Sequence, residues 1–294
     1  MISLGSINYK ISILVTFMFI ILVPLLSDSF VDFFWGFGVL TLGILHGAND
    51  IKIISKNFKE KSNYFYFRSI LIYSSVVLLG AVFFFTLPAL ALLFFILFSS
   101  YHFGEQHWED RLSMSPAHFA LYIVYGAFIF FLMFVLQYES VVEVIQKISG
   151  YSFEYNFFFY STIIIGLFLA VQMIANKHSR SDFLKEVLLL ILLGGVFYVG
   201  SLLFAFAFYF VVWHSIPSLF DQLKFLYGEM NFYSFLKYLK SSLIYWMASL
   251  VSLFLVYRYI NFEADYFMPL LFSFLAAITF PHTLVIGMMK HKKG

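Results

Sequence analysis

The sequence predicts an all-α protein, a polytopic transmembrane helix bundle of about ten spans with both termini in the cytoplasm. Hydrophobic residues make up 62% of the 294 residues and charged residues only 12%, about half the charged fraction of soluble domains. Long apolar segments recur along the whole chain, and the lysines and arginines gather on one side of them. These observations favour a single integral-membrane domain over residues 1–294, located in the cell membrane as a multi-pass protein.

A helix needs about 20 mainly apolar residues to cross the hydrocarbon core of a bilayer. The segments that approximately meet this need are 9–26, 30–48, 66–86, 88–106, 117–137, 157–176, 184–199, 201–222, 237–258 and 266–288. We expect the first segment to be retained, because it lacks a small-residue cleavage site and another apolar run follows at once. Residues 184–222 are too long for one helix, and Gly194, Gly195 and Gly200 predict a turn that divides them into two spans.

The positive charges predict the orientation of these spans. With about ten spans the two termini share a side, and all 18 lysines and arginines except Lys147 and Arg258 fall on that side. Cytoplasmic loops carry an excess of lysine and arginine. Both termini are therefore predicted to be cytoplasmic, and the even-numbered spans run from the outside to the cytoplasm.

Four histidines lie at or near the downstream ends of even-numbered spans, namely His46, His102, His214 and His282. The predicted orientation brings all four to the cytoplasmic side of the bundle. An ionisable side chain inside a bilayer is costly, and it usually marks a functional site. The chain has no cysteine, so imidazole and carboxylate groups are the expected ligands of a transition metal. Imidazole suits iron, zinc, copper and nickel.

Other residues near these histidines support a site. Asp50 lies one turn beyond the first histidine and is expected to orient its second ring nitrogen. Glu105 follows the second histidine at a spacing that places both on one helix face. His107 lies off that face near the predicted water boundary, where we expect it to be solvated. Pro217 and Pro281 are expected to kink the helices that carry the last two histidines.

Four motifs together resemble the Brp/Blh family of membrane carotenoid oxygenases, in which H-G-x-x-D, Y/F-H-F-G-x-x-D/H, W-H-S-x-R-H and a late P-H follow one another. This chain reads His46-Gly47-Ala48-Asn49-Asp50, Tyr101-His102-Phe103-Gly104-Glu105-Gln106-His107, Trp213-His214-Ser215-Ile216-Pro217-Ser218 and Pro281-His282. Their order and spacing match, so the resemblance covers nearly the full length of the chain.

The resemblance implies an iron-dependent dioxygenase that cleaves the central 15,15′ double bond of β-carotene with dioxygen and gives two molecules of retinal. Carried over by position, His46, His102 and His214 are ligands of Fe(II). One position departs from the family pattern, because Ser218 stands where the family has a further histidine. A serine hydroxyl is a poor iron ligand, so either His282 completes the site, or three histidines and water hold the iron, or the activity has changed.

The resemblance also implies surroundings and partners for this site. Asp50, Glu105 and Asp221 are expected to form the second shell around the ligands, with Ser218 beside them. β-Carotene would arrive from the lipid bilayer, and a retinal-binding rhodopsin is a candidate recipient of the product. The net charge of +2 indicates no nucleic-acid partner.

Two other classes of function remain open. A transporter would use buried histidines and carboxylates as a proton relay, but the sequence shows no inverted repeat with paired interrupted spans. A carotenoid-binding membrane protein with altered catalysis is the second alternative, which the serine at position 218 keeps open.

Overall fold

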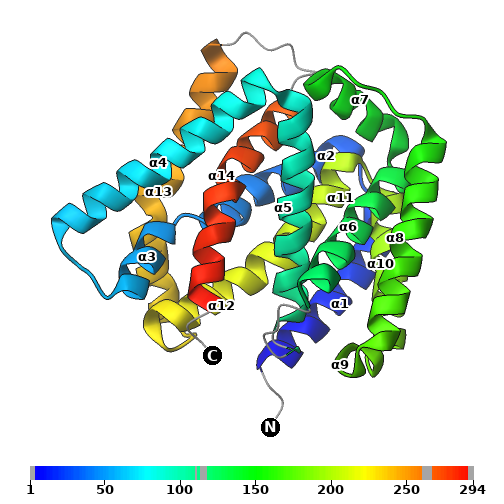
Figure 1. Ribbon diagram of the computed structural model, residues 1–294, viewed down its shortest axis with the longest axis horizontal. Coiled ribbons are helices and arrows are strands. Elements are labelled where there is room, and N and C mark those ends of the chain that lie inside the picture. Colours follow the sequence, from blue (N-terminus) through cyan, green and yellow to red (C-terminus); the bar gives the residue numbers. More distant parts are fainter. Residues whose placement is uncertain (1–3, 110, 113–117, 260–266, 291–294) are drawn as a thin grey trace. The chain divides into compact units, whose positions relative to one another are not determined.

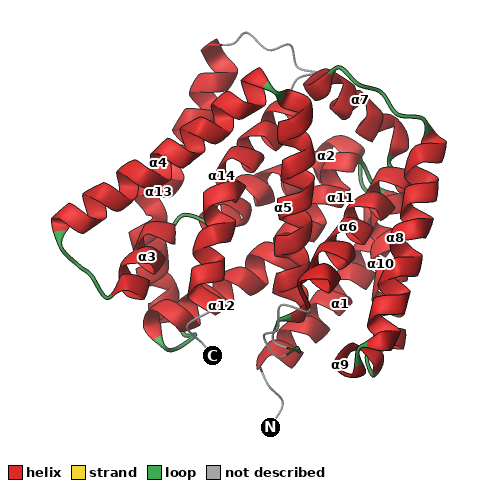
Figure 2. Ribbon diagram, in the orientation of Figure 1, coloured by secondary structure: helices red, strands yellow, loops and turns green. Residues whose placement is uncertain are grey.

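The computed structural model describes residues 4–109, 111–112, 118–259 and 267–290, and the regular secondary structure of these residues is helical (Figure 2). The α-helices are α1 (Leu4–Leu22), α2 (Asp28–Gly38), α3 (Asp50–Phe58), α4 (Asn63–Thr86), α5 (Pro88–Trp108), α6 (Phe119–Leu136), α7 (Tyr138–Ser149), α8 (Tyr155–Ala175), α9 (Lys177–Arg180), α10 (Phe183–Val199), α11 (Leu202–Phe208), α12 (Ile216–Tyr227), α13 (Phe232–Tyr259) and α14 (Phe267–Lys290). A 3₁₀ turn, η1 (Val23–Leu25), and two π-helices, η2 (Val39–Gly43) and η4 (Tyr209–Ser215), complete the described elements. The all-α prediction is confirmed.

Seven helices in the described part of the chain are long and apolar enough to cross a membrane. They are Asn63–Thr86, Pro88–Trp108, Phe119–Leu136, Tyr155–Ala175, Leu202–Tyr227, Phe232–Arg258 and Met268–Met289. Other predicted spans coincide with shorter helices. Helix α2 has 11 residues before it widens into η2, and α10 has 17. The count of about ten spans and the cytoplasmic location of both termini stay predictions.

Three helices, α3, α7 and the four-residue α9, lie where the sequence predicts loops. Helix α3 follows the second predicted span and α7 follows the fifth. Both are amphipathic, with apolar residues such as Ile51 and Val141 buried and polar residues such as Glu139 exposed. The span prediction missed them because their mean hydropathy is low, although their apolar residues recur at helical spacing.

The chain divides into two compact units, which are described separately. Unit 1 comprises Met1–Val39, Ser99–Glu143 and Ser152–Pro217, and unit 2 comprises Leu40–Phe98, Val144–Tyr151 and Ser218–Gly294. Helix α5 begins in unit 2 and ends in unit 1. The single integral-membrane domain predicted for residues 1–294 stays a prediction.

In unit 1, α6 packs against α8, α1 against α10, and α11 against α2. Helices α5 and α6 cross with their backbones in close contact. A Cβ atom added to Gly104 would lie 1.9 Å from the backbone oxygen of Tyr122, and one added to Gly126 would lie 2.0 Å from that of Ser100. Because the two backbones touch, only glycine fits at either position. This crossing fixes the part of α5 that carries His102.

In unit 2, α14 packs against α3 and α4, and α3 packs against α4 (Figure 1). A buried hydrophobic cluster joins residues from the end of the second predicted span with α3, α12, α13 and α14. Its members are Leu45, Ile53, Leu219, Leu223, Leu226, Tyr238, Val285, Ile286 and Met289. These large buried side chains form a hydrophobic core, and the neighbouring polar groups lie beside it.

A π-helix adjoins two of the four candidate histidines. Helix η2 ends three residues before His46, and η4 contains His214. The wider turn leaves backbone groups to be satisfied in other ways, and the Ser215 hydroxyl donates a 2.8 Å hydrogen bond to the carbonyl of Phe210. Helix η4 ends just before Pro217, whose missing N–H was predicted to disturb this helix. Short π-helical segments often occur at functional sites.

Candidate metal centre

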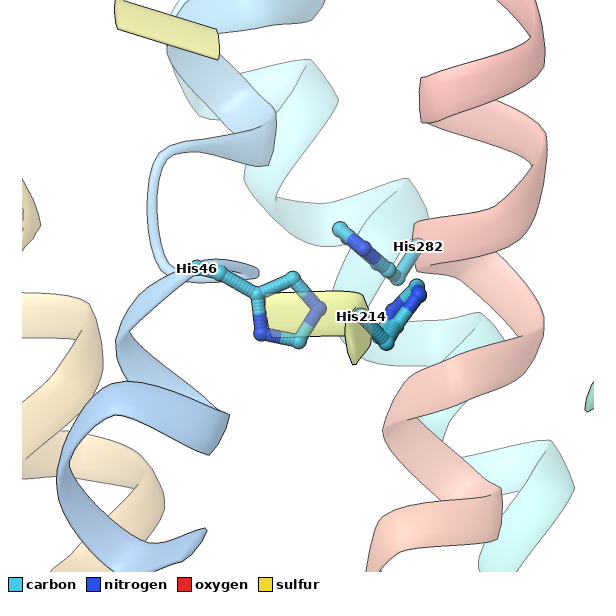
Figure 3. Close-up of side chains that lie close together, drawn as sticks. All are labelled: His46, His214 and His282. Carbon is cyan, nitrogen blue, oxygen red and sulfur yellow. The ribbon is translucent and has the colours of Figure 1, made fainter. Parts of the chain in front are cut away.

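In unit 2, His46 and His282 form a buried pair. Their ring centroids are 4.7 Å apart and the rings are nearly perpendicular, at 88°. His46 lies in the turn that follows η2, and His282 projects from α14 (Figure 3). Each ring offers a nitrogen, and these two nitrogens lie within 4.8 Å of each other. Two imidazoles at this separation are close enough to share one ion after a small adjustment of their side chains.

Each ring of this pair is held through its Nδ1 atom. The Nδ1 of His282 lies 3.0 Å from both carboxylate oxygens of Asp50, and the Tyr73 hydroxyl donates a 2.7 Å hydrogen bond to Oδ2 of the same carboxylate. The Nδ1 of His46 bonds to the carbonyl of Gly43. A histidine that donates its Nδ1 proton to such an acceptor presents Nε2 to a metal, and the acceptor fixes the orientation of the ring.

The contact made by Asp50 differs from the one expected from the sequence. Spacing predicted that this carboxylate would orient His46, but it bonds to His282 instead. Residues 46–49 form a turn rather than a continuous helix, and Asp50 is the first residue of α3. The one-turn spacing therefore does not place the two side chains on a common helix face.

In unit 1, His102 and His214 form a second buried pair. Their ring centroids are 4.6 Å apart, and each residue is 1% exposed. Phe103 and Phe210 pack against His214, with ring centroids 4.9 and 5.6 Å away. These two rings restrict the orientations of the imidazole and help to keep water from it.

Glu105 is buried beside this second pair, as the sequence predicted from its spacing. One of its oxygens accepts a 2.7 Å hydrogen bond from the Tyr101 hydroxyl, and the other lies 3.8 Å from Nδ1 of His102. The second distance is too long for a hydrogen bond. Glu105 thus lies beside the His102 ring, and the Tyr101 hydroxyl holds its carboxylate.

The expectation that His107 is solvated is wrong. Its Nε2 lies 2.8 Å from a carboxylate oxygen of the fully buried Glu186 on α10, and the Tyr125 hydroxyl also contacts both groups. Arg111 bonds to the other oxygen of Glu186. Burial alone would lower the pKa of Arg111, but the charge and hydrogen bond of Glu186 raise it above its usual value. Nothing in the spacing of these residues indicated that α10 supplies this carboxylate to the end of α5.

The two polar residues near Pro217 that were assigned to the second shell differ in burial, and their assignment stays a prediction. Ser218 is fully buried and accepts a 3.2 Å hydrogen bond from Nε2 of Gln222, whereas Asp221 is partly exposed. Gln222, Tyr238 and Tyr73 are polar residues at the site that sequence reasoning missed. A glutamine one helical turn after Ser218 was a usable signal, but nothing in the sequence distinguishes these two tyrosines among the chain's 20.

Three buried histidines, His46, His214 and His282, could hold a metal ion (Figure 3). Imidazole is a ligand that a buried site without cysteine can offer to a transition metal. The Nδ1 atoms of His46 and His282 are held by other groups, so Nε2 is the atom that each ring would present to the metal. His102 is outside this group of three, and its ring lies beside that of His214.

Residues 37–290 match the family described as beta-carotene 15,15'-dioxygenase. The chain belongs to the beta-carotene 15,15'-dioxygenase family. The matched region contains all four motifs on which the resemblance was based, so that recognition is confirmed. No curated protein and no solved structure matched the chain. The family name supports the assignment of the chain as a carotenoid dioxygenase.

The contact between Tyr73 and Asp50 leads to a first prediction. We expect Tyr73→Phe to weaken metal binding by about 10-fold, because the carboxylate that orients His282 loses a hydrogen bond. The measurement is a titration of the chelator-treated protein with Co(II) in detergent. Tyr64→Phe is the control, since Tyr64 lies on the same helix and is 74% exposed. Equal affinities in the two variants would show that Tyr73 does not support the metal centre.

Proposed function

We propose that the chain cleaves the central 15,15′ double bond of β-carotene with dioxygen and releases two molecules of retinal. Membership of the beta-carotene 15,15'-dioxygenase family carries this proposal. The buried histidines support it, because the reaction needs a site that binds and activates dioxygen, and imidazoles are suited to hold a metal for that purpose. The seven apolar helices agree with a substrate that dissolves in a bilayer.

The proposed ligands are the four histidines predicted from the sequence. His46, His214 and His282 are the buried group that could hold a metal, and we assign His102 as a fourth ligand because its ring lies beside that of His214. Iron(II), when bound, would supply the activation of dioxygen that open-sited non-haem iron provides. Asp50 and Glu105 would act in the second shell, Asp50 through His282 and Glu105 through His102.

The protein's own contribution is orientation and the exclusion of water. The contacts of Nδ1 with Asp50 and with the Gly43 carbonyl orient the His282 and His46 rings and would present Nε2 to a metal. Phe103 and Phe210 beside His214 give an apolar, aromatic lining that suits a conjugated chain. Such a lining also protects a reactive intermediate from water.

The reaction balances without a further reductant. The carbon–carbon double bond breaks, and each of its two carbons takes one oxygen atom from dioxygen and becomes an aldehyde. We place the entry of β-carotene in the bilayer, since the substrate has no polar group. A retinal-binding rhodopsin remains a proposed recipient of the product.

The experiment that tests the proposal is expression of the full chain in bacterial cells that make β-carotene. We expect the cells to lose their colour and to accumulate retinal, measured by chromatography of extracts. His46→Ala, compared at equal membrane content, should abolish both changes because it removes a proposed ligand. Purified protein loaded with iron that leaves β-carotene intact would overturn the proposed activity. If that protein still retained carotenoid, the binding protein without catalysis would take its place.

A further inference from the structure

Tyr238 is a buried side chain that joins the His46 turn to α12. It lies on α13 and is fully buried, and its hydroxyl is 3.0 Å from the backbone carbonyl of His46 and 2.8 Å from Oε1 of Gln222. A third contact, of 3.2 Å, reaches the carbonyl of Leu45. A buried phenol whose hydroxyl contacts two backbone carbonyls and a side-chain amide is costly to lose, because its partners would be left in an apolar surrounding.

The contacts continue from Gln222 to Ser218. The amide of Gln222 is 3.2 Å from the Ser218 hydroxyl, and it fits its place in either orientation because the two ends of an amide have the same shape. In the orientation observed, Nε2 of Gln222 donates to Ser218 and Oε1 of Gln222 accepts from the Tyr238 hydroxyl, which also lies against the carbonyl of His46. These contacts lead from Ser218 to the backbone carbonyl of a proposed metal ligand.

A second tie holds the other end of the same turn. Asn49, three residues after His46, donates a 3.1 Å hydrogen bond to the backbone carbonyl of Tyr238 and accepts a 2.7 Å bond from the Ser241 hydroxyl. Residues 46–49 form a turn rather than a helix, so their position depends on such outside contacts. Tyr238 therefore fixes the turn at both ends, through its hydroxyl and through its carbonyl.

We propose that Tyr238, supported by Gln222 and Ser218, is a positioning residue that sets the place of the His46 imidazole for metal binding. This inference rests on the proposed function, since it takes His46 to be a ligand. It also gives Ser218 a role. At the position where the family pattern has a histidine, this chain carries the first member of a hydrogen-bonded chain that leads to His46.

The test is a Co(II) titration of the full chain, purified in detergent and stripped with chelator. We expect Tyr238→Phe to bind cobalt about 10- to 100-fold more weakly than the unmodified protein, the range typical for loss of a group that orients a ligand. Its visible cobalt spectrum should also change, because the His46 ring is displaced. Tyr233→Phe is the matched control, since Tyr233 lies on the same helix and is 65% exposed, and this variant is expected to leave affinity and spectrum unchanged.

Gln222→Met provides a second variant in case Tyr238→Phe does not fold. It keeps the length of the side chain and removes the contacts with Tyr238 and Ser218, so we expect a smaller loss of affinity in the same direction. A variant that unfolds at a lower temperature but binds cobalt with unchanged affinity and spectrum would overturn the positioning role and leave the proposed function intact. Failure of the unmodified protein to bind either cobalt or iron would instead overturn the proposed metal centre, and the inference with it.

Discussion

His282→Ala is expected to remove metal binding as completely as His214→Ala does, with a loss of affinity of at least about 100-fold. The reason is the place of the ring, which lies against that of His46 and is held by both oxygens of Asp50. A histidine held in this way is oriented as metal-ligating histidines are, with Nδ1 anchored and Nε2 as the donor. We expect the iron content of purified protein and the formation of retinal to fall together in both variants.

The control for this pair is His118→Ala, because His118 is also buried but belongs to neither histidine pair. It should retain its iron. An unchanged iron content in His282→Ala would remove this residue from the site and leave three histidines and water as the ligands. Asp50→Asn adds a graded test, since an amide can still accept a hydrogen bond from Nδ1 but carries no charge, and it should weaken iron binding less than the loss of His282.

Hydropathy was sufficient to predict the long apolar helices, because the length of an apolar segment in a membrane protein indicates where a helix lies. Each predicted span coincides with a described helix, although α2 and α10 are shorter than the seven that meet the length for crossing. Amphipathic helices such as α7 were missed because their apolar residues occupy one face only, which lowers their mean hydropathy. The π-helical turns η2 and η4 cannot be predicted from the hydropathy of their residues.

The candidate site was predictable where function limits the choice of residue. Histidines in apolar segments are costly, so His46 and His282 stood out in the sequence, and the structure places them side by side. The groups that hold them did not stand out. Asp50 was assigned to the wrong histidine because the turn at residues 46–49 breaks the helical spacing, and Tyr238 was missed because tyrosine is common in membrane helices.

Gly104→Ala is expected to lower the thermal stability of the protein more than Gly166→Ala or Gly287→Ala. The added Cβ would lie 1.9 Å from the Tyr122 carbonyl oxygen and 2.6 Å from its carbon. These are backbone atoms of α6, which cannot rotate away, so α5 and α6 must separate by more than about 1 Å. Overpacking of this kind typically costs up to about 3 kcal/mol, and contact with backbone places this site at or beyond that limit. Thermal unfolding in detergent measures the loss.

A series of glycines separates this steric effect from the general effect of adding a methyl group. At Gly166 the new atom would meet the edge of the Phe128 ring at 2.8 Å, and this ring can move, so Gly166→Ala should cost less. At Gly287 nothing lies within 4 Å, and alanine should be neutral or stabilise the helix by up to about 1 kcal/mol. If all three variants unfolded at the same temperature, α5 and α6 would not meet at Gly104. In the expected order, Gly104→Ala also displaces His102, which lies two residues away, so its iron affinity should fall even at temperatures where the protein remains folded.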